Sequence, residues 1–432
     1  MLIGWMFVIS AVAFLDRVNI SVAGKSIETE FHLTDIQLGW VFSSFVLGYA
    51  LFQAPGGRIA DRFGPRRVIA FATLWWGVFT ALTGLIPSTI AGSLVALMAA
   101  RFALGLGESV VYPASNRLVA SWIPTRERGL ANGLIFSGVG AGAGISPPLI
   151  AWVMVNYGWR ASFVLSAAIG LAVGAVWLWI CRDRPDQHPW VAPEEKEYIQ
   201  AGLPAKIEGR PPLGWGVILT NRNVVWITLS YVTFGYAAYI FFTWFFIYLN
   251  TVRGLNLKAS ALYAMLPFIA MAIGSPLGGW ISDLMLPRFG RRVARCGVAV
   301  AGLGLAALFI ALGTQVADAR LASIVLAGGA GALYLSQSSF WAVTSEIGGN
   351  SSGSVSGVMN MGNQLAGALT ASLSPYIAAQ FGWTTSFMVA AGLCFLGALA
   401  WLMIDPAQAI AGVSAKTEAP SGMGRLTPKT AE

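Results

Sequence analysis

Long apolar stretches alternate with short polar segments along almost the whole chain. About twelve of these stretches hold roughly twenty residues, the length that an α-helix needs to cross a bilayer. In the first half we expect them at residues 2–23, 36–59, 68–87, 92–121, 129–153 and 160–181. In the second half we expect them at residues 223–249, 259–282, 293–314, 320–345, 354–379 and 384–404. The pattern therefore predicts an all-α polytopic membrane protein with twelve transmembrane helices.

A long polar segment separates the first six stretches from the last six. Residues 182–222 are rich in Pro, Glu, Lys and Arg, and the last residues of the chain contain Ser, Thr, Pro and Lys. A segment of that composition buries too little apolar surface to fold by itself. We therefore predict a six-helix bundle at 1–181, a cytoplasmic linker at 182–222, a second bundle at 223–405 and a disordered cytoplasmic tail at 406–432.

The two halves repeat each other in two places. The loop at residues 57–67 has an echo at 279–292, and Gly158-Trp159 followed by Ser162-Phe163 has an echo in Gly382-Trp383 followed by Ser386-Phe387. Both echoes lie a little over two hundred residues downstream and in the same order. A parallel duplication of this kind is typical of transporters that rock two bundles around a central site.

Composition excludes most other classes of protein. Hydrophobic residues make up 56% of the chain and charged residues 11%, whereas a soluble domain carries about 25% charged residues. The net charge of +8 could indicate nucleic-acid binding, but the basic residues gather in short loops between apolar stretches. That distribution follows the positive-inside rule, so we expect both termini to be cytoplasmic in an inner, or plasma, membrane. Met1 opens directly onto the first apolar stretch, which leaves open a start site further upstream.

Four ionisable residues interrupt stretches that are otherwise apolar. They are Asp16 and Arg17 in the first stretch and Arg101 and Glu108 in the fourth. A charge at membrane depth costs at least ~2.5 kcal/mol, so it persists only beside a partner or in a watery cavity. These residues indicate a pathway for an anion, with a carboxylate available to carry a proton.

The spacing of these residues restricts what each pair can do. Arg101 and Glu108 lie about two helical turns apart on one face, whereas the neighbours Asp16 and Arg17 point about 100° apart. A guanidinium binds a carboxylate through a fork of two hydrogen bonds, and burial favours the protonated form of a carboxyl group such as Glu108. The alternative is a pair of structural ion pairs that only fix helix contacts.

The loop at residues 57–67 resembles the signature of the major facilitator superfamily, G-x-x-x-D-R-x-G-x-R-R. Here Asp61, Arg62 and Arg66 occupy the signature, and Asp283 and Arg291 occupy its echo in the second half. An acid beside arginines at a helix end can hold neighbouring bundles together in one state and release them in the other. The alternative is a basic loop that only sets the orientation in the membrane.

Further motifs resemble the anion:cation symporter family of that superfamily. They are residues 14–19, the R-x-x-x-G-x-x-E stretch at 101–108 followed by Pro113 and Asn116-Arg117, and residues 359–367. Bacterial members of the family import sugar acids such as hexuronates, galactonate and glucarate together with protons, and animal relatives carry glutamate and sialic acid. The resemblance implies that Arg17 binds the substrate carboxylate, that Asp16 and Glu108 take up protons, and that Arg101 pairs with one acid or attracts the anion.

Neutral polar residues complete the expected substrate site. The resemblance places a substrate contact at Tyr49, with Gln53 one turn further on the same face, although an interfacial or packing role for Tyr49 is an alternative. The second half has no charge well inside a helix and offers hydroxyl and amide groups instead, which we expect to bind the hydroxyls of a polyol chain: Tyr239, Gln337, Ser339, Asn360 and Asn363. Such residues are also ordinary contacts between membrane helices.

The chain departs from the family at two points. Phe14 stands where the family often has Tyr, which removes one hydroxyl, and residues 243–249 lack the Pro that is frequent in the seventh helix. These differences bear on the range of substrates and on the bend of that helix.

We therefore predict a proton-coupled symporter that imports an organic anion, foremost a sugar acid, by alternating access and as a monomer. The alternatives are an importer of a monocarboxylate or aromatic acid and a drug/proton antiporter. The latter is disfavoured because intramembrane arginines suit anions and the fifth helix lacks the G-P-x-x-G-G pattern. A sensor is disfavoured because the linker and tail leave no room for a signalling domain. We expect no enzyme activity, catalytic residue, cofactor, metal or nucleic-acid partner, since no suitable cluster occurs.

Overall fold

The computed structural model describes residues 1–204 and 212–410, and within them the secondary structure is helical without a strand. The first half contains α1 (Leu2–Phe31), α2 (Asp35–Phe63), α3 (Pro65–Leu85), α4 (Ser93–Glu108), α5 (Val111–Trp122), α6 (Arg128–Tyr157) and α7 (Trp159–Ile180). Two short helices follow, α8 (Pro193–Gly202) and α9 (Trp215–Thr220). The second half contains α10 (Arg222–Thr243), α11 (Phe245–Ile247), α12 (Leu257–Ala264), α13 (Leu266–Arg291), α14 (Gly297–Gln315), α15 (Ala319–Gly348), α16 (Ser352–Phe381) and α17 (Trp383–Ala400).

By length and composition, the described helices can cross a membrane twelve times. Ten helical runs in the described residues are long and apolar enough to span a bilayer, and two of them, with 57 and 63 residues, hold two spans each. Each long run is broken by a glycine with positive φ, Gly290 at 73° and Gly349 at 50°, a conformation that glycine adopts without a steric penalty. Ten runs plus these two extra spans give twelve. The predicted fold class is therefore confirmed.

Three helices differ from their predicted form. α1 continues through the polar residues 24–30 and ends where His32 turns left-handed, at φ 52°. The fourth span breaks after Glu108 because Pro113 has no N–H to donate to the carbonyl group of Ser109. The seventh span breaks at Trp244 (φ −113°) without any proline. There the Thr243 hydroxyl donates to the Tyr239 carbonyl, a local bond that competes with the helix ladder.

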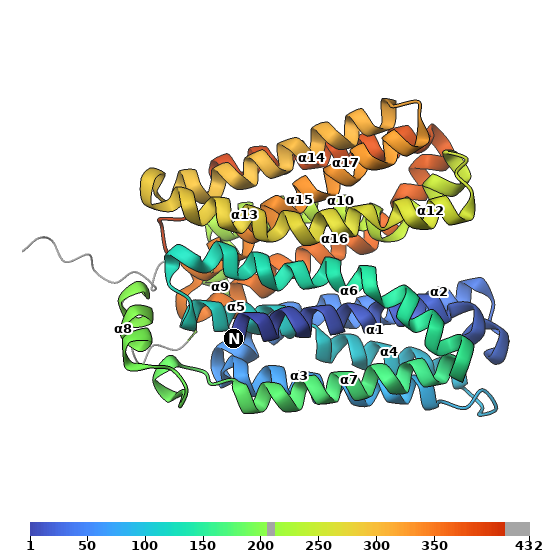
Figure 1. The fold of residues 1–432 in the computed structure, drawn as a ribbon, viewed down its shortest axis with the longest axis horizontal. Helices are drawn as coiled ribbons and strands as arrows, with labels where there is room; N and C mark the ends of the chain where they lie inside the picture. Colours follow the sequence, from blue (N-terminus) through green and yellow to red (C-terminus); the bar gives the residue numbers. More distant parts are fainter. Residues whose placement is uncertain (205–211, 411–432) are drawn as a thin grey trace, which may run out of the picture.

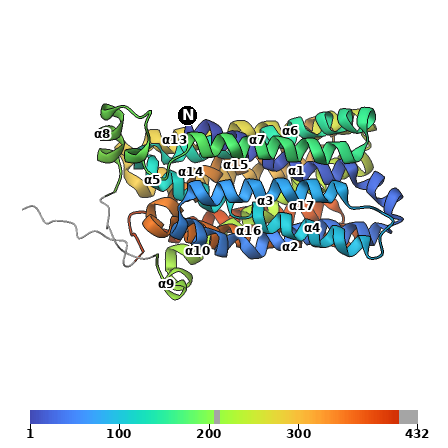
Figure 2. The same ribbon diagram turned by 90° about the horizontal axis from the view of Figure 1, so that it is seen from below.

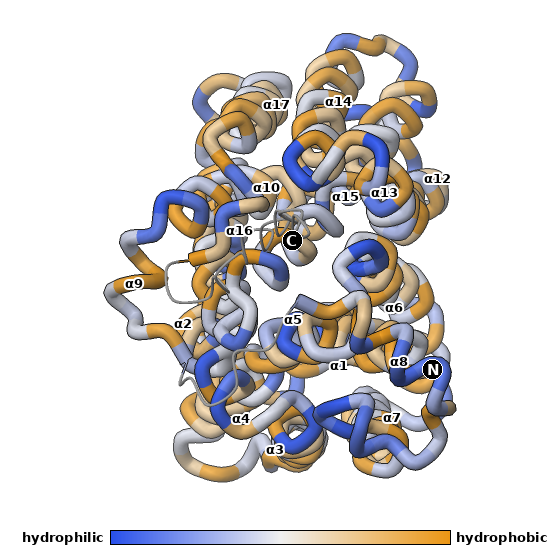
Figure 3. The backbone as a smooth tube through the Cα atoms, turned by 90° about the vertical axis from the view of Figure 1, so that its left-hand side faces the viewer, coloured by the Kyte–Doolittle hydropathy of each residue, from blue (hydrophilic) through white to orange (hydrophobic). Residues whose placement is uncertain are grey.

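The helices run parallel to the long axis, with α1–α7 in one half of the molecule and α10–α17 in the other (Figure 1). The linker helices α8 and α9 lie at one end, as a second view also shows (Figure 2). We call this the basic end, because the loops at 62–67, 126–128 and 288–292 carry arginines there. Seen from this end, hydrophilic residues gather in the loops while the helices are mostly apolar (Figure 3). Residues 205–211 of the predicted linker and 411–432 of the predicted tail lie outside the described residues, and the domain boundaries stay predictions.

Glycines bring the two halves into close contact at the basic end. α2 packs on α16, and α6 packs on α13. A side chain on Gly57 would come closer than 3.0 Å to the carbonyl group of Gly353, and one on Gly279 would do the same at Gly129. Small residues of this kind let membrane helices approach until their backbones touch. The halves therefore fit together here only as long as these positions lack a side chain.

Gly57→Ala should destabilise this arrangement by about 1–3 kcal/mol, because the added methyl group meets backbone rather than a side chain that could move. The thermal unfolding midpoint of the detergent-solubilised protein should fall by a few degrees. Gly39→Ala is the matched control, since a Cβ at Gly39 meets nothing within 4 Å. An equal midpoint for both variants would contradict the close packing of α2 on α16.

Candidate functional site

An ion pair joins α1 and α4 of the first half. The Nε of Arg17 is 2.7 Å from the Oε1 of Glu108, whose side chain is 1% exposed. Glu108 is the last residue of α4, directly before the break that Pro113 causes. The second carboxylate oxygen of Glu108 and the Nη2 of Arg17 have no hydrogen-bond partner among the described residues. The pair therefore retains one acceptor and one donor for further interactions.

Aromatic rings surround the guanidinium of Arg17. Its central carbon lies 4.1 Å from the ring centre of Tyr49, 4.8 Å from that of Phe14 and 5.5 Å from that of Phe45. Phe14 also contacts Phe242 of α10, with 5.8 Å between ring centres. A cation over aromatic faces is stabilised by the ring quadrupole, more strongly when water is excluded. The rings thus hold Arg17 in a low-dielectric setting between the two halves.

Asp16 points away from the Arg17–Glu108 pair, as expected of neighbours on a helix. Its side chain is buried, and its Oδ2 accepts a hydrogen bond of 3.3 Å from the hydroxyl of Thr80 on α3. The other carboxylate oxygen has no partner in the described part of the chain. Asp16 and Glu108 therefore occupy separate environments within the same half.

Arg101 is buried without a direct ion pair. It is 2% exposed, and among residues 1–204 and 212–410 no carboxylate lies within 4.0 Å of it. Its guanidinium lies 4.8 Å from the ring centre of Phe45, the ring that Arg17 also contacts. The structure therefore pairs Glu108 with Arg17 and leaves Arg101 nearby as a second buried cation.

Amide side chains connect the two halves beside this site. The Asn360 amide of α16 donates to Gln53 of α2 at 2.9 Å, and Asn363 donates to Asn360 at 3.4 Å. The Nε2 of Gln53 and the Oδ1 of Asn363 have no partner among the described residues. This chain of amides keeps a free donor at one end and a free acceptor at the other.

The remaining polar candidates lie within the second half. The Tyr239 hydroxyl donates to Gln364 at 2.5 Å, and Gln337 donates to Tyr231 at 2.8 Å. Ser339 is fully buried, and its hydroxyl has no partner in the described residues. Gln337 is therefore engaged inside its own half, whereas Ser339 keeps its hydrogen-bonding capacity.

At the basic end, Asp61 caps the N-terminus of α16. Its carboxylate accepts hydrogen bonds from the backbone N–H of Gly353 (2.9 Å) and from the N–H and hydroxyl of Ser354 (2.7 and 2.6 Å). Arg117 lies 3.8 Å away. A carboxylate at a helix N-terminus satisfies free N–H groups and complements the helix dipole. We call this contact between the halves the Asp61 latch.

Asp283 makes the corresponding contact in the second half. It accepts from the backbone N–H of Gly129 (3.0 Å) and Leu130 (2.6 Å) at the start of α6. Arg295 lies 2.5 Å from Asp283 and 2.9 Å from Glu346. We call this contact the Asp283 latch. Both latches therefore join a helix end of one half to a helix start of the other.

The arginines named from the loop motif do not contact these acids. Arg62 and Arg291 are exposed, and Arg66 donates to the carbonyl group of Leu178 inside the first half. The contacts that sequence reasoning missed are Arg117, Arg295, Glu346 and Ser354. Arg295 lies one helical turn beyond Arg291. The helical register after Gly290 decides that Arg295, and not Arg291, contacts Asp283, and the loop motif does not give that register.

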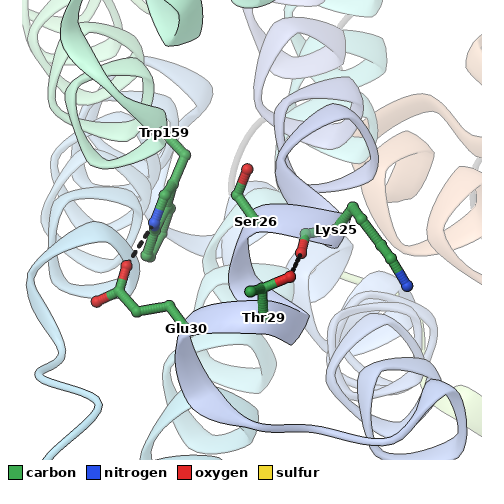
Figure 4. A pocket seen from close by; sticks show the side chains of 5 residues that line it. All are labelled: Lys25, Ser26, Thr29, Glu30 and Trp159. Carbon is green, nitrogen blue, oxygen red and sulfur yellow. Dashed lines mark hydrogen bonds between the residues drawn. The ribbon is translucent and has the colours of Figure 1, made fainter.

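A hollow of about 400 Å³ lies at the opposite end of α1. It is lined by Lys25, Ser26, Thr29, Glu30 and Trp159, and the Trp159 indole donates to Glu30 at 2.8 Å (Figure 4). Lys25 follows Arg17 by about two helical turns, roughly 12 Å along the axis. The hollow therefore lies at one end of the first half and is separate from the candidate site at Arg17 and Glu108.

Comparison with known proteins identifies the family of the chain. Residues 6–371 and 351–428 match the family model of the Major Facilitator Superfamily. The chain is 35% identical to the probable sulfoacetate transporter SauU of Cupriavidus necator, over 94% of each protein. It is 30% identical to the hexuronate transporter of Bacillus subtilis over 96% of each protein, and 31% identical to the probable galactarate/D-glucarate transporter GudP of Escherichia coli over 71% of this chain and 70% of the relative.

Among solved structures, the proton:xylose symporter XylE shares the fold, with a TM-score of 0.72 and 17% identity over 92% of this chain and 94% of that chain. The protein is thus a multi-pass membrane transporter rather than an enzyme, and the three sequence relatives are named as transporters or probable transporters of organic anions. The chain belongs to the Major Facilitator Superfamily.

Proposed function

We propose that the protein imports an organic acid anion together with protons by alternating access. The observation that carries this proposal is the Arg17–Glu108 pair, in which Glu108 is buried, Arg17 is 14% exposed and each side chain has one unpartnered atom. Arg17 offers the anion a fork of donors, and Glu108 is the group that the anion must replace. A displaced carboxylate at this depth is stable only when it binds a proton. Anion binding and proton uptake are therefore linked at one pair of residues.

The transport cycle follows from this exchange. From the outside, protons reach Glu108 and Asp16 while the substrate carboxylate takes the place of Glu108 on Arg17. A dianion between Arg17 and Arg101 then leaves the centre neutral, and a monoanion leaves it with one positive charge. The two halves rock so that substrate and protons leave on the inner side. Arg101, close to both acids, holds a positive charge beside them and attracts the anion. Because one chain carries all of these residues, we propose that the monomer transports.

The Asp61 and Asp283 latches are the gates in this proposal. They close the basic end, which we assign to the cytoplasmic side of the inner membrane because arginine-rich loops follow the positive-inside rule. Both termini are then cytoplasmic. The present structure corresponds to the state closed toward the cytoplasm, and the latches open when the halves rock.

Two classes of substrate fit the site. A sugar acid is favoured by unpartnered polar atoms that could bind its hydroxyls, namely Gln53 Nε2, Asn363 Oδ1 and the Ser339 hydroxyl. A small dianion such as sulfoacetate is the second candidate, because Arg101 provides a second buried cation without an ion pair and a relative is named for that substrate. The two classes of substrate differ in the hydrogen bonds that they need from the second half.

A transport panel should separate the two classes. Proteoliposomes with an imposed inward proton gradient would be given labelled galactonate, glucuronate, glucarate, gluconate, lactate, an aromatic acid and sulfoacetate. We expect accumulation of a sugar acid, with Asn363→Ala reducing it about tenfold through the loss of a hydrogen bond. Accumulation of sulfoacetate alone, unaffected by Asn363→Ala, would assign the second class instead.

Arg17→Lys should reduce uptake of the accumulated anion by about tenfold to a hundredfold, because an ammonium group cannot reproduce the planar fork of a guanidinium. Initial uptake rates in proteoliposomes measure this loss. Arg222→Lys makes the same chemical change at an exposed helix start and should leave uptake within about twofold. Equal rates for both variants would remove Arg17 from the binding site.

Glu108→Gln should abolish accumulation against a gradient, since the amide can neither carry a proton nor hold Arg17 as an ion. Exchange of internal for external anion should persist, because exchange needs no net proton movement. Glu195→Gln, at an exposed position of the linker helix α8, is the control and should accumulate normally. Gradient-driven accumulation by the Glu108→Gln variant would refute the coupling role.

A further inference from the structure

The three threonines of α3 use their hydroxyl groups in different ways. Thr73 donates to the carbonyl group of Ala70 at 2.9 Å, and Thr83 donates to that of Phe79 at 2.8 Å. Both satisfy the hydroxyl within their own helix, as threonine commonly does in a membrane. Thr80 instead donates to the carboxylate of Asp16 on α1. Its hydroxyl group thus bonds to another helix instead of to a carbonyl group of its own helix.

The contact between Thr80 and Asp16 is shielded from solvent. Thr80 is 1% exposed and Asp16 is 2% exposed. The charged groups near Asp16 are Arg101 and Glu108, both from α4, besides its neighbour Arg17, which is turned toward Glu108. α6 and α7 also pack against α1, but their charged residues, Arg128 and Arg160, lie at the helix starts. Thr80 is therefore the hydroxyl donor to this carboxylate among the described residues, and the indole of Trp76, also on α3, faces it as well.

We propose that Thr80 is a positioning residue that sets the pH at which Asp16 takes up its proton. The inference rests on the proposed role of Asp16 as a proton site. A hydroxyl that donates to the carboxylate favours its ionised form. It also orients the carboxyl group toward α3 and away from Arg17, so that Asp16 stays a separate proton site from Glu108. After protonation, the same hydroxyl can accept a hydrogen bond from the neutral acid.

The hydrogen bond from Thr80 determines in which direction a substitution shifts the protonation of Asp16. Thr80→Val keeps the shape of the side chain and removes the donor, so the ionised form of Asp16 loses a stabilising bond. Protonation then occurs at a higher pH. At 3.3 Å the bond is long for a hydroxyl donor, so we expect a shift of about half to one pH unit. Thr80→Ser, which retains the hydroxyl, should restore the original behaviour.

The test measures protonation directly and needs no substrate. The full-length protein in proteoliposomes would be titrated while infrared difference spectra record the carboxyl C=O stretch, with Asp16→Asn identifying the band of Asp16. We expect the midpoint of that band to move upward in Thr80→Val and to stay in place in Thr80→Ser. Thr83→Val is the matched control, because Thr83 is equally buried on the same helix and bonds only within it.

The infrared titration can contradict the proposed role of Thr80 in two ways. An unchanged or lowered midpoint in Thr80→Val, or a spectrum in which Asp16→Asn removes no titrating band, would overturn it. Failure of the proposed function would look different. In that case the infrared midpoint shifts as expected, but the pH profile of anion uptake does not shift with it.

Discussion

The Arg17–Glu108 ion pair restricts which charged groups can enter or leave the centre of the protein. Breaking a buried pair by removing one partner costs about 3–5 kcal/mol, because the remaining charge stays in a low-dielectric interior. The rings of Phe14, Phe45 and Tyr49 strengthen this constraint by covering the guanidinium. Glu108 can therefore leave Arg17 only when another anion replaces it and a proton neutralises it. This requirement of constant charge at the Arg17–Glu108 pair joins substrate binding to proton uptake.

The same helices connect the centre to the basic end. Gln53 meets Asn360 on the α2–α16 pair, and about two turns further along these helices Asp61 caps the start of α16. The linker joins them at this point: the Leu213 carbonyl accepts from Arg58 of α2, and the Leu213 N–H donates to Ser351 before α16 at 2.8 Å. A change at the amides thus acts on rigid elements that also carry the Asp61 latch.

Much of this arrangement could be predicted from the sequence, and the rest depends on packing between helices. Apolar length predicts twelve spans, and charges at membrane depth single out Arg17 and Glu108. Spacing along one helix, however, cannot show that Glu108 pairs with Arg17 from α1 rather than with Arg101 on its own helix. Nor can a loop motif show that Asp283 contacts Arg295, since the turn at Gly290 sets the helical register of the residues after it.

The number of protons taken up when the anion binds tests the exchange of anion and Glu108 at Arg17. Purified protein in weakly buffered solution at mildly alkaline pH would receive the transported anion while an indicator dye records the pH. Because binding and protonation are thermodynamically linked, we expect uptake of about one to two protons per anion bound, with the proton of Glu108 missing in Glu108→Gln. Anion binding without proton uptake, or an uptake as large in Glu108→Gln as in the unchanged protein, would contradict the exchange at Arg17.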